Sequence, residues 1–294
     1  MKNSRSDCGP TPRKLYARKL IWRIISIIPR EMTLQTKNGI LTFNTRDRVL
    51  GKALYSSGNY EWNTIVAVIE TLRRHSLLRG RMMLDVGANI GMISIACLRN
   101  GFFDRAMAFE PEAYNFNLLQ RNVHQNQLSE KIECFNCALS SEDGTLDLEL
   151  SRDNFGDHRI RWRQSAKPGF YREEKRKTLP VKVMRLDDLF SANPNARDSI
   201  GLAWVDIQGH EGHFLKGARD TIRRRVPVVC EFWPYAMDRA GTSKDEFIGL
   251  AKDLFTGCYH ITANKPPEWS AIENLNRLFD EYRLPREMGT VLFV

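Results

Sequence analysis

The strongest constraint on the fold is an alternation of short apolar runs and amphipathic stretches that begins at Met82 and continues to the C-terminus. It predicts strands near residues 82–87, 105–110, 132–137, 201–207, 227–232, 258–262 and 289–294, and helices near 90–99, 113–125, 211–225 and 243–255. Strands that alternate with helices in this way form a mostly parallel sheet with helices on both faces. We therefore expect an α/β fold around a seven-stranded sheet over residues 81–294.

Two smaller elements precede this domain. The pair Asn38-Gly39, a strong turn signal, separates two runs of alternating apolar and polar side chains and predicts a β-hairpin. A run with helical spacing follows and ends before Gly80. Within the segment 31–80, these runs cover residues 32–37, 40–45 and 62–78. We expect the hairpin and the helix to pack on the core.

Residues 1–30 form a basic N-terminal extension, with eight Lys and Arg side chains against Asp7. Thr11-Pro12 predicts a helix start and Pro29 its end. The apolar side chains spread around most of the helix circumference. Two interpretations stay open: a helix that lies on a membrane surface, or one that docks on the body or on a partner.

No apolar run reaches the roughly 20 residues needed to cross a bilayer. The basic start of the chain is not followed by the apolar core and small-residue cleavage site of a signal peptide. We expect a cytoplasmic protein, either free or held peripherally at the inner face of the membrane. The six cysteines are scattered and predict free thiols rather than a disulfide or a metal site.

The net charge of +9 is concentrated in two segments. Residues 1–30 are one of them, and residues 152–182, with ten Lys and Arg against four acids, are the other. The remainder of the chain is mildly acidic. This distribution predicts that an anionic surface or substrate is contacted at these two places.

A tight turn follows the first core strand, and its residues predict a nucleoside site. Gly87 and Gly91 lack a Cβ, so the backbone can approach a ligand, and Asn89 offers side-chain hydrogen bonds. Glu110 ends the second strand, where a carboxylate can accept both hydroxyls of a ribose. A dinucleotide site would need glycine at 87, 89 and 92, but Asn89 and Met92 stand there. We expect a cofactor without a pyrophosphate, namely S-adenosylmethionine; a purely structural turn is the alternative.

Taken together, these motifs resemble the FkbM-type methyltransferases, a branch of the Rossmann-like class I methyltransferase fold. The resemblance begins at about Tyr60-Glu61 and rests on residues 84–91, 109–111, Asn122, 136–140, 186–189, 205–211 and Glu231. It implies O-methylation of a hydroxyl on a sugar or glycan, a glycolipid, a polyketide-like metabolite or a similar small acceptor. Two positions depart from the family pattern, since Trp204 replaces a frequent lysine and Gln208 a frequent glutamate.

The resemblance also implies roles for individual residues. The first turn holds the methionine part of the cofactor, Glu110 the ribose, and the strand end at 136–138 flanks the adenine. The implied cofactor-binding residues are Asp85, Gly87, Ala88, Asn89, Gly91, Glu110, Asn136, Ala138 and Asp206. The residues expected to contact the acceptor are Glu61, Asn154, Arg159, Arg161, Gln208 and Glu231.

Methyl transfer from a sulfonium to an alcohol requires in-line positioning, a dry pocket and a base, and no metal is expected. His210, Asp206 and His158 are the candidates for the base. A histidine, with a reference pKa of about 6.5, can accept a proton near neutral pH. The alternatives are a hydrogen-bonded histidine at a helix start for His210, a cofactor or acceptor ligand for Asp206, and a surface turn for His158.

The basic insert, residues 151–182, follows the third core strand and a further predicted strand at 145–150. We expect the insert over the carboxyl edge of the sheet, beside the nucleoside site. If the insert is extended, Arg159, Arg161 and Arg163 share one face. It is then either a lid that grips a phosphate or carboxylate on the acceptor, or a solvated charged loop.

Two functions from other classes stay open. The basic charge would suit a nucleic-acid methyltransferase. Against it, the exit of the fourth strand reads Asp206-Ile207-Gln208-Gly209 and lacks the Asn/Asp-Pro-Pro-aromatic run of enzymes that methylate base amino groups. A non-catalytic subunit that binds a partner through residues 1–30 is the other alternative. The intact Asp85, Gly87 and Glu110 speak against it.

Overall fold

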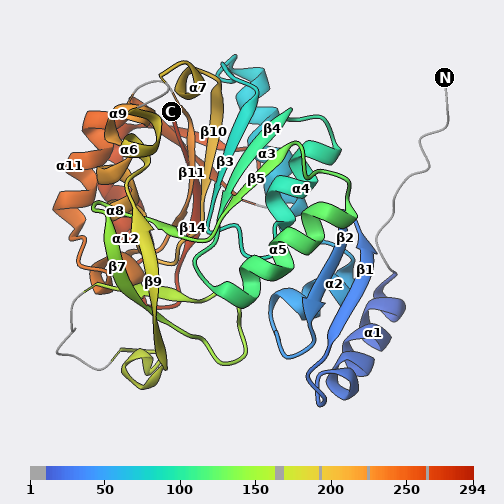
Figure 1. The fold of residues 1–294 in the computed structure, drawn as a ribbon. Helices are drawn as coiled ribbons and strands as arrows, with labels where there is room; N and C mark the ends of the chain where they lie inside the picture. Colours follow the sequence, from blue (N-terminus) through green and yellow to red (C-terminus); the bar gives the residue numbers. More distant parts are fainter. Residues whose placement is uncertain (1–10, 163–168, 192–193, 224–225, 263–264) are drawn as a thin grey trace, which may run out of the picture.

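The computed structural model describes residues 11–162, 169–191, 194–223, 226–262 and 265–294. Expectations that concern residues 1–10 and Arg163 lie outside these residues. The chain folds around an eight-stranded sheet with the strand order β13-β12-β14-β11-β10-β3-β4-β5 (Figure 1). The strands are β3 (Met82–Val86), β4 (Arg105–Phe109), β5 (Ile132–Phe135), β10 (Ile200–Val205), β11 (Val228–Phe232), β12 (Gly257–Ile261), β13 (Glu268–Ala271) and β14 (Gly289–Phe293).

The direction of these strands confirms the predicted α/β class. The five strands from β5 to β11 run parallel to one another, and β14 runs antiparallel between β11 and β12. All seven predicted strands are present. The eighth strand, β13, pairs with β12 at the edge of the sheet. Its four residues, Glu-Trp-Ser-Ala, form too short a run for their alternation to predict a strand from the sequence.

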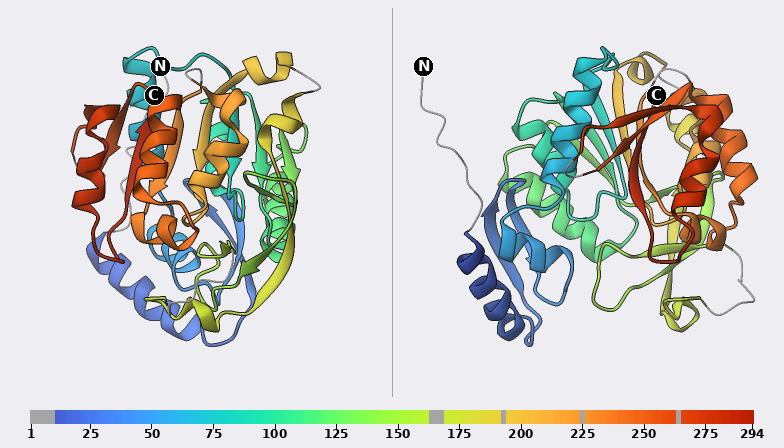
Figure 2. Two further views of the ribbon diagram at one scale, coloured as in Figure 1. Left: turned by 90° about the vertical axis from the view of Figure 1, so that its left-hand side faces the viewer. Right: turned by 180° about the vertical axis from the view of Figure 1, so that it is seen from behind.

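Helices cover both faces of the sheet (Figures 1 and 2). Helices α3, α4 and α5 contribute to one apolar core, and α8 and α11 to the other. The helix predicted over 211–225 is divided at Ala218 into α8 and α9. The longer helices are α1 (Pro12–Ile25), α2 (Leu50–Ser57), α3 (Trp62–Arg74), α4 (Met92–Arg99), α5 (Ala113–Gln125), α8 (Glu211–Gly217) and α11 (Lys244–Leu254); the shorter ones are α6 (Leu186–Ser191), α7 (Pro194–Asp198), α9 (Arg219–Ile222), α10 (Pro234–Arg239) and α12 (Asn276–Glu281).

The basic insert contributes to a second, four-stranded sheet with the order β6-β9-β7-β8. The strands are β6 (Ala138–Leu139), β7 (Gly144–Glu149), β8 (Arg159–Arg161) and β9 (Thr178–Met184). Strand β7 confirms the strand predicted near 145–150. Both β8 and β9 pair antiparallel with β7. Two short parts of the insert, residues 159–161 and 178–182, are therefore held in a sheet, which the interpretation as a solvated loop did not anticipate.

The hairpin around Asn38-Gly39 is present as β1 (Glu31–Thr36) and β2 (Gly39–Asn44), as predicted. Helix α1 begins at Pro12 and ends before Pro29. It packs through Trp22, whose ring lies 5.4 Å from that of Tyr55 on α2. Among the described residues, no helix combines the length and the apolar composition that a bilayer span requires.

Two asparagines at the C-terminal end of α5, Asn122 in the helix and Asn126 at its C-cap, join the hairpin to the core. Asn122 accepts a hydrogen bond from Thr42 N at 2.7 Å and donates to Thr42 O at 3.1 Å and to Ile90 O at 2.8 Å. Asn126 makes the same pair of bonds with Ile40, at 3.0 and 2.7 Å. Side-chain amides thus take the place of a neighbouring strand along β2.

The buried Asn122 amide gives a test of this docking. Asn122→Ala leaves buried backbone groups without partners, so we expect the free energy of unfolding to fall by about 2 to 3 kcal/mol. Chemical denaturation measures the change. Asn117→Ala, an exposed position on the same helix, is the matched control and should have little effect. Equal stability of the two variants would contradict the docking role of Asn122.

Candidate active site

The turn between β3 and α4 has the backbone geometry that its glycines were expected to allow. Gly87 and Gly91 have φ angles of 82° and 86°, and Asn89 is also left-handed, with a φ of 51°. A Cβ on Gly87 would lie 2.0 Å from the backbone oxygen of Asp206. Glycine at 87 therefore permits direct contact between the exits of β3 and β10.

Two buried carboxylates fix this turn. Glu110 accepts hydrogen bonds from Asn89 N at 2.9 Å and from Glu112 N at 2.8 Å, one on each oxygen. Asp85 accepts a bond from Ser94 N at 3.0 Å in the first turn of α4. Burial raises the pKa of Glu110 to about 8 and that of Asp85 to about 6, against the opposing effect of these bonds.

Two cavities meet at this turn, and both are lined by Gly87, Asn89, Gly156 and Asp206. The narrower cavity has Glu110 in its wall, and its apolar lining includes Phe109, Pro111, Ala138, Leu139, Leu148, Phe155, Ile160 and Ile207. The larger cavity, of about 300 Å³, is more polar, and its lining includes Tyr60, Glu61, Asp85, Ala88, Asn154, Asp157, Arg159, Trp204, Gln208 and Glu231. Gly87, directly after β3, and Asp206, directly after β10, thus lie at the junction of the two cavities.

The loop from Ser151 to His158 closes over the turn. The Phe155 carbonyl accepts hydrogen bonds from Asn89 Nδ2 at 3.1 Å and from Asn115 Nδ2 at 3.0 Å. Phe155 N donates to Asp47 Oδ2 at 3.1 Å. The Asn89 amide is therefore engaged by the protein chain, and the loop forms a wall of both cavities.

Gln208 joins two carboxylates in the wall of the larger cavity. Its Nε2 donates to Asp206 Oδ1 at 2.7 Å and to Glu231 Oε2 at 2.8 Å. Asp206 follows β10, and Glu231 lies near the end of β11, so the parallel pairing of these strands brings them together. Gln208 itself adopts a left-handed φ of 56°, a conformation that non-glycine residues seldom hold without a tertiary constraint.

This wall is acidic. Burial raises the pKa of Asp206 to about 6 and that of Glu61 to about 8, and the proximity of Asp206 to Glu61 adds to the second shift. The pKa of Glu231 is raised well above its ordinary value, first by burial and then by repulsion from Asp206. Trp204, which stands where the family often has a lysine, adds an apolar surface and no positive charge.

The two histidines proposed as bases lie away from this wall. His210 lines the narrower cavity, where its Nε2 bonds to Ser140 Oγ at 2.9 Å and its ring stacks on that of His213. Burial lowers the pKa of His210 well below its ordinary value. His158 accepts a hydrogen bond from Ser151 N at 3.0 Å, and burial lowers its pKa to about 4. Neither histidine lines the larger cavity.

Ala138, Asn136 and Gly91 were all assigned to the cofactor, but only the first of them lines a cavity. Ala138 lines the narrower cavity. Asn136 is exposed and donates from Nδ2 to Glu110 O at 2.9 Å and to Pro111 O at 3.2 Å. Neither Asn136 nor Gly91 lines either cavity. Asn136 instead fixes the backbone that carries Glu110, and Gly91 allows the close approach of Leu119.

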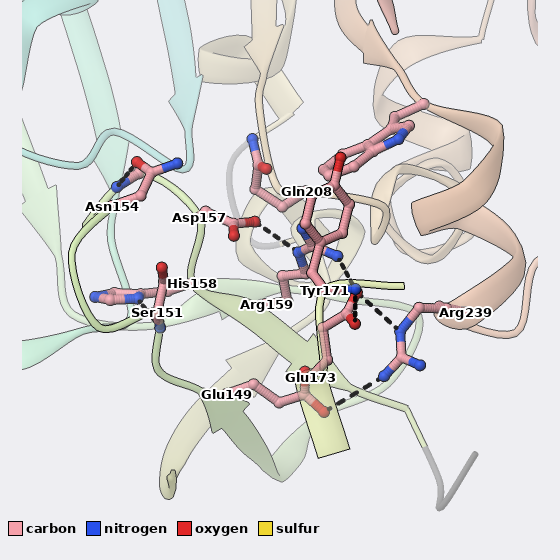
Figure 3. A network of polar contacts seen from close by, with 12 residues as sticks. Glu149, Ser151, Asn154, Asp157, His158, Arg159, Tyr171, Glu173, Gln208 and Arg239 are labelled. Atoms are coloured by element: carbon pink, nitrogen blue, oxygen red, sulfur yellow. Dashed lines mark hydrogen bonds and ion pairs between the residues drawn. The ribbon is translucent and has the colours of Figure 1, made fainter. Parts of the chain in front are cut away.

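Arg159 and Arg161 of the insert form ion pairs within the protein, and Figure 3 shows those of Arg159. Arg159 bonds to Asp157 at 2.6 Å and to Glu173 at 2.9 Å, and Arg161 bonds to Glu149 at 2.8 Å. The guanidinium of Arg159 also lies 4.4 Å from the ring centre of Trp233. Carboxylates of the protein thus engage both guanidinium groups, and contact of Arg159 and Arg161 with an acceptor stays a prediction.

Some residues of the larger cavity were missed by the sequence argument. Tyr60 reaches the cavity because Asn38 binds its backbone N and O, both at 2.9 Å. Trp233 directly follows β11. Ligands bind at the carboxyl ends of parallel strands, so this position could have been predicted as a site residue. Asp157 and Tyr171 come from the insert, and only the pairing of the insert with β7 brings them here.

Comparison with known proteins gives consistent results. The family description "Methyltransferase FkbM domain" matches residues 85–254. Methyltransferase sdnD of Sordaria araneosa is 28% identical over 172 residues, which are 51% of this chain and 66% of that protein. Methyltransferase 1 of Beauveria bassiana is 26% identical over 201 residues, or 64% of this chain and 75% of that protein.

Among solved structures, methyltransferase FkbM from Methylobacillus flagellatus is similar, with 17% identity and a TM-score of 0.40. The match covers 75% of this chain and 46% of that one. The chain thus spans just under two thirds of the first relative and less than half of the crystallised protein. The family match covers more than half of the chain and includes the turn after β3, Glu110 and the β10 exit. This chain belongs to the FkbM methyltransferase family.

Proposed function

We propose that this methyltransferase uses S-adenosylmethionine and methylates a hydroxyl of an uncharged, hydroxyl-rich acceptor such as a sugar. One observation carries the proposal. The apolar cavity beside Glu110 passes, at Gly87 and Asp206, into a polar cavity whose wall holds the two carboxylates bridged by Gln208. This arrangement supports a nucleoside on one side and an acceptor on the other.

The residues present fit the cofactor. Each oxygen of Glu110 accepts one backbone N–H, which leaves a further lone pair on each for a ribose hydroxyl. The apolar walls of the narrower cavity suit an adenine ring, and Asp85 and Glu61 would hold the ammonium group of the methionine part. When bound, the cofactor supplies a methyl group already activated by the positive sulfonium.

The chain's own contribution at the acceptor is a carboxylate pair held by one amide. The Gln208 amide has two N–H groups, so each carboxylate accepts one and keeps its other oxygen for an acceptor or a proton. Because Asp206 has the lower pKa of the two, it takes the proton of the acceptor hydroxyl, while Glu231 carries a proton and donates. Asp206 is thus our proposed base in place of His210 and His158.

The charge of the larger cavity bears on the choice of acceptor. Glu61, Asp85, Asp206 and Glu231 face it, and Arg159 is already paired with Asp157 and Glu173. A phosphate or carboxylate would find no unpaired cation in this lining and would stand beside Asp85 and Asp206, and the backbone of a nucleic acid would do the same. Hydroxyl groups, in contrast, donate to carboxylates. The wall therefore favours an uncharged acceptor over the anionic one suggested by the basic insert.

The cofactor assignment predicts a specific loss of affinity in Glu110→Gln. We expect S-adenosylhomocysteine to bind the unchanged protein with micromolar affinity or better, about −8 kcal/mol. In the variant the affinity should fall about 10- to 100-fold, because an NH2 donor replaces one of the two oxygens that would accept a ribose hydroxyl. Isothermal titration calorimetry measures both, and Glu133→Gln, an exposed position on β5, is the control. Binding of a dinucleotide but not of S-adenosylhomocysteine would refute the assignment.

The choice of base predicts different effects for two variants. Asp206→Asn keeps the size of the side chain but removes its basicity, so turnover should fall by about 10² to 10⁴. His210→Ala should lower turnover by less than about tenfold. Release of S-adenosylhomocysteine with a panel of monosaccharides and glycosides reports turnover. A large loss in His210→Ala together with an active Asp206→Asn would return the role to His210.

The raised pKa of Asp206 also predicts the pH profile. A base must be deprotonated to act, so activity should be full above the pKa of about 6 and fall as the pH drops through it. We expect kcat/KM for a responsive acceptor to decrease about tenfold per pH unit below that point. The measurement is kcat/KM against pH, and a flat profile across this range would exclude a base with this pKa.

A further inference from the structure

Helix α1 leaves one side uncovered. Trp22 is its one buried side chain and packs against Phe43 and Tyr55. On the opposite side Tyr16, Leu20 and Ile24 repeat every four residues. These positions, with Ile21 and, after the helix, Ile27 and Ile28, are between 45% and 73% exposed. Side chains four residues apart share a helix face, so the exposed groups form an apolar stripe.

Positive charge surrounds this stripe. Residues 11–30 contain six Lys and Arg and no acid. A groove of about 430 Å³ beside the stripe is lined by Tyr16, Lys19, Leu20, Trp22, Arg23, Ser26, Arg48 and Lys52. In the part of the chain that the structure describes, Lys19, Arg23 and Lys52 have no carboxylate at ion-pair distance, and Arg48 pairs with Asp153 at 3.5 Å. The groove thus gathers four cations next to exposed apolar side chains.

The helix also lies at the edge of the molecule and packs on α2, the helix whose first residues line the larger cavity. Figure 2 shows α1 at the periphery, with one side turned away from the body. Its other side packs on α2, and Val49 and Leu50 at the start of α2 line the larger cavity. Val49 and Met288, which line the same cavity, are exposed apolar side chains.

We propose that α1 docks on the surface of a membrane that contains anionic lipids. The apolar stripe enters the boundary between headgroups and acyl chains, and the cations of the groove contact headgroup phosphates. An apolar face combined with flanking cations is the pattern of a helix that lies in the plane of a membrane interface. Docking in this way would bring the side of the enzyme that carries Val49 close to the lipid surface. The proposal does not depend on the identity of the methyl acceptor.

Cosedimentation of the full chain with vesicles tests the proposal. We expect binding to vesicles of phosphatidylcholine with phosphatidylglycerol, weaker binding at higher salt, and little binding to phosphatidylcholine alone. Ile24→Ser/Ile27→Ser should weaken binding more than about tenfold. Lys19→Gln/Arg23→Gln should weaken it about 25-fold, at about fivefold for each cation.

The control is Arg105→Gln/Lys131→Gln, which also removes two positive charges. Arg105 begins β4 and Lys131 directly precedes β5, and both are exposed. This variant should bind vesicles like the unchanged protein. Thermal unfolding verifies that each variant is folded. Equal binding to both kinds of vesicle, or normal binding of the isoleucine variant, would overturn the proposal. If no vesicle binds and light scattering shows a dimer that the isoleucine variant dissociates, the stripe is an interface between two copies and the membrane proposal fails.

Discussion

The contact between Gly87 and the backbone of Asp206 is the constraint on which the site depends. A side chain at 87 would collide with that backbone, so the exits of β3 and β10 could not touch. Because they do touch, the turn that faces Glu110 and the segment that carries Gln208 become parts of one surface. The two cavities meet at this contact. The packing of the backbone alone would then place the cofactor next to the acceptor, without a contribution from polar side chains.

Acidic side chains outnumber basic ones on this surface. Glu61, Asp206 and Glu231 are half-buried in the lining of the same cavity, and Trp204 supplies no cation. An amide at 208 donates to two of these carboxylates, whereas a glutamate there would add a further acid. The left-handed backbone at Gln208 shows that the surrounding structure holds the amide in place at some conformational cost. A cationic cofactor is suited to such an environment, since its own charge offsets the wall.

Much of this structure could be predicted from the sequence, because the signals are local. The strand and helix pattern, the hairpin at Asn38-Gly39, the turn at Gly87 and the carboxylate at Glu110 each depend on a few neighbouring residues. The fate of the arginines could not be predicted in the same way. Arg159 pairs with Glu173 across 14 residues, and only the folded insert reveals that its charge is used internally. Without that knowledge, a segment rich in arginine resembles an anion site.

The histidines show the same limit. A histidine after a core strand satisfies every local criterion for a base, and His210 stands four positions after Asp206. Its bond to Ser140, 70 residues away, turns the ring into the narrower cavity. Chemical suitability is a property of the residue type, whereas proximity to the acceptor is a property of the packing. The sequence could supply the candidates but could not rank them.

The attachment of the N-terminal hairpin has a consequence for how the molecule opens. Strand β2 is bonded to the core by side chains at the C-terminal end of α5, namely Asn122, Gln125 and Asn126, and not by a further strand. The hairpin would separate from the core along this row of side-chain bonds. The backbone N–H groups of Ile40 and Thr42 can exchange with solvent hydrogen only when the hairpin leaves α5. Their exchange rates would report the opening of this joint separately from the unfolding of the sheet.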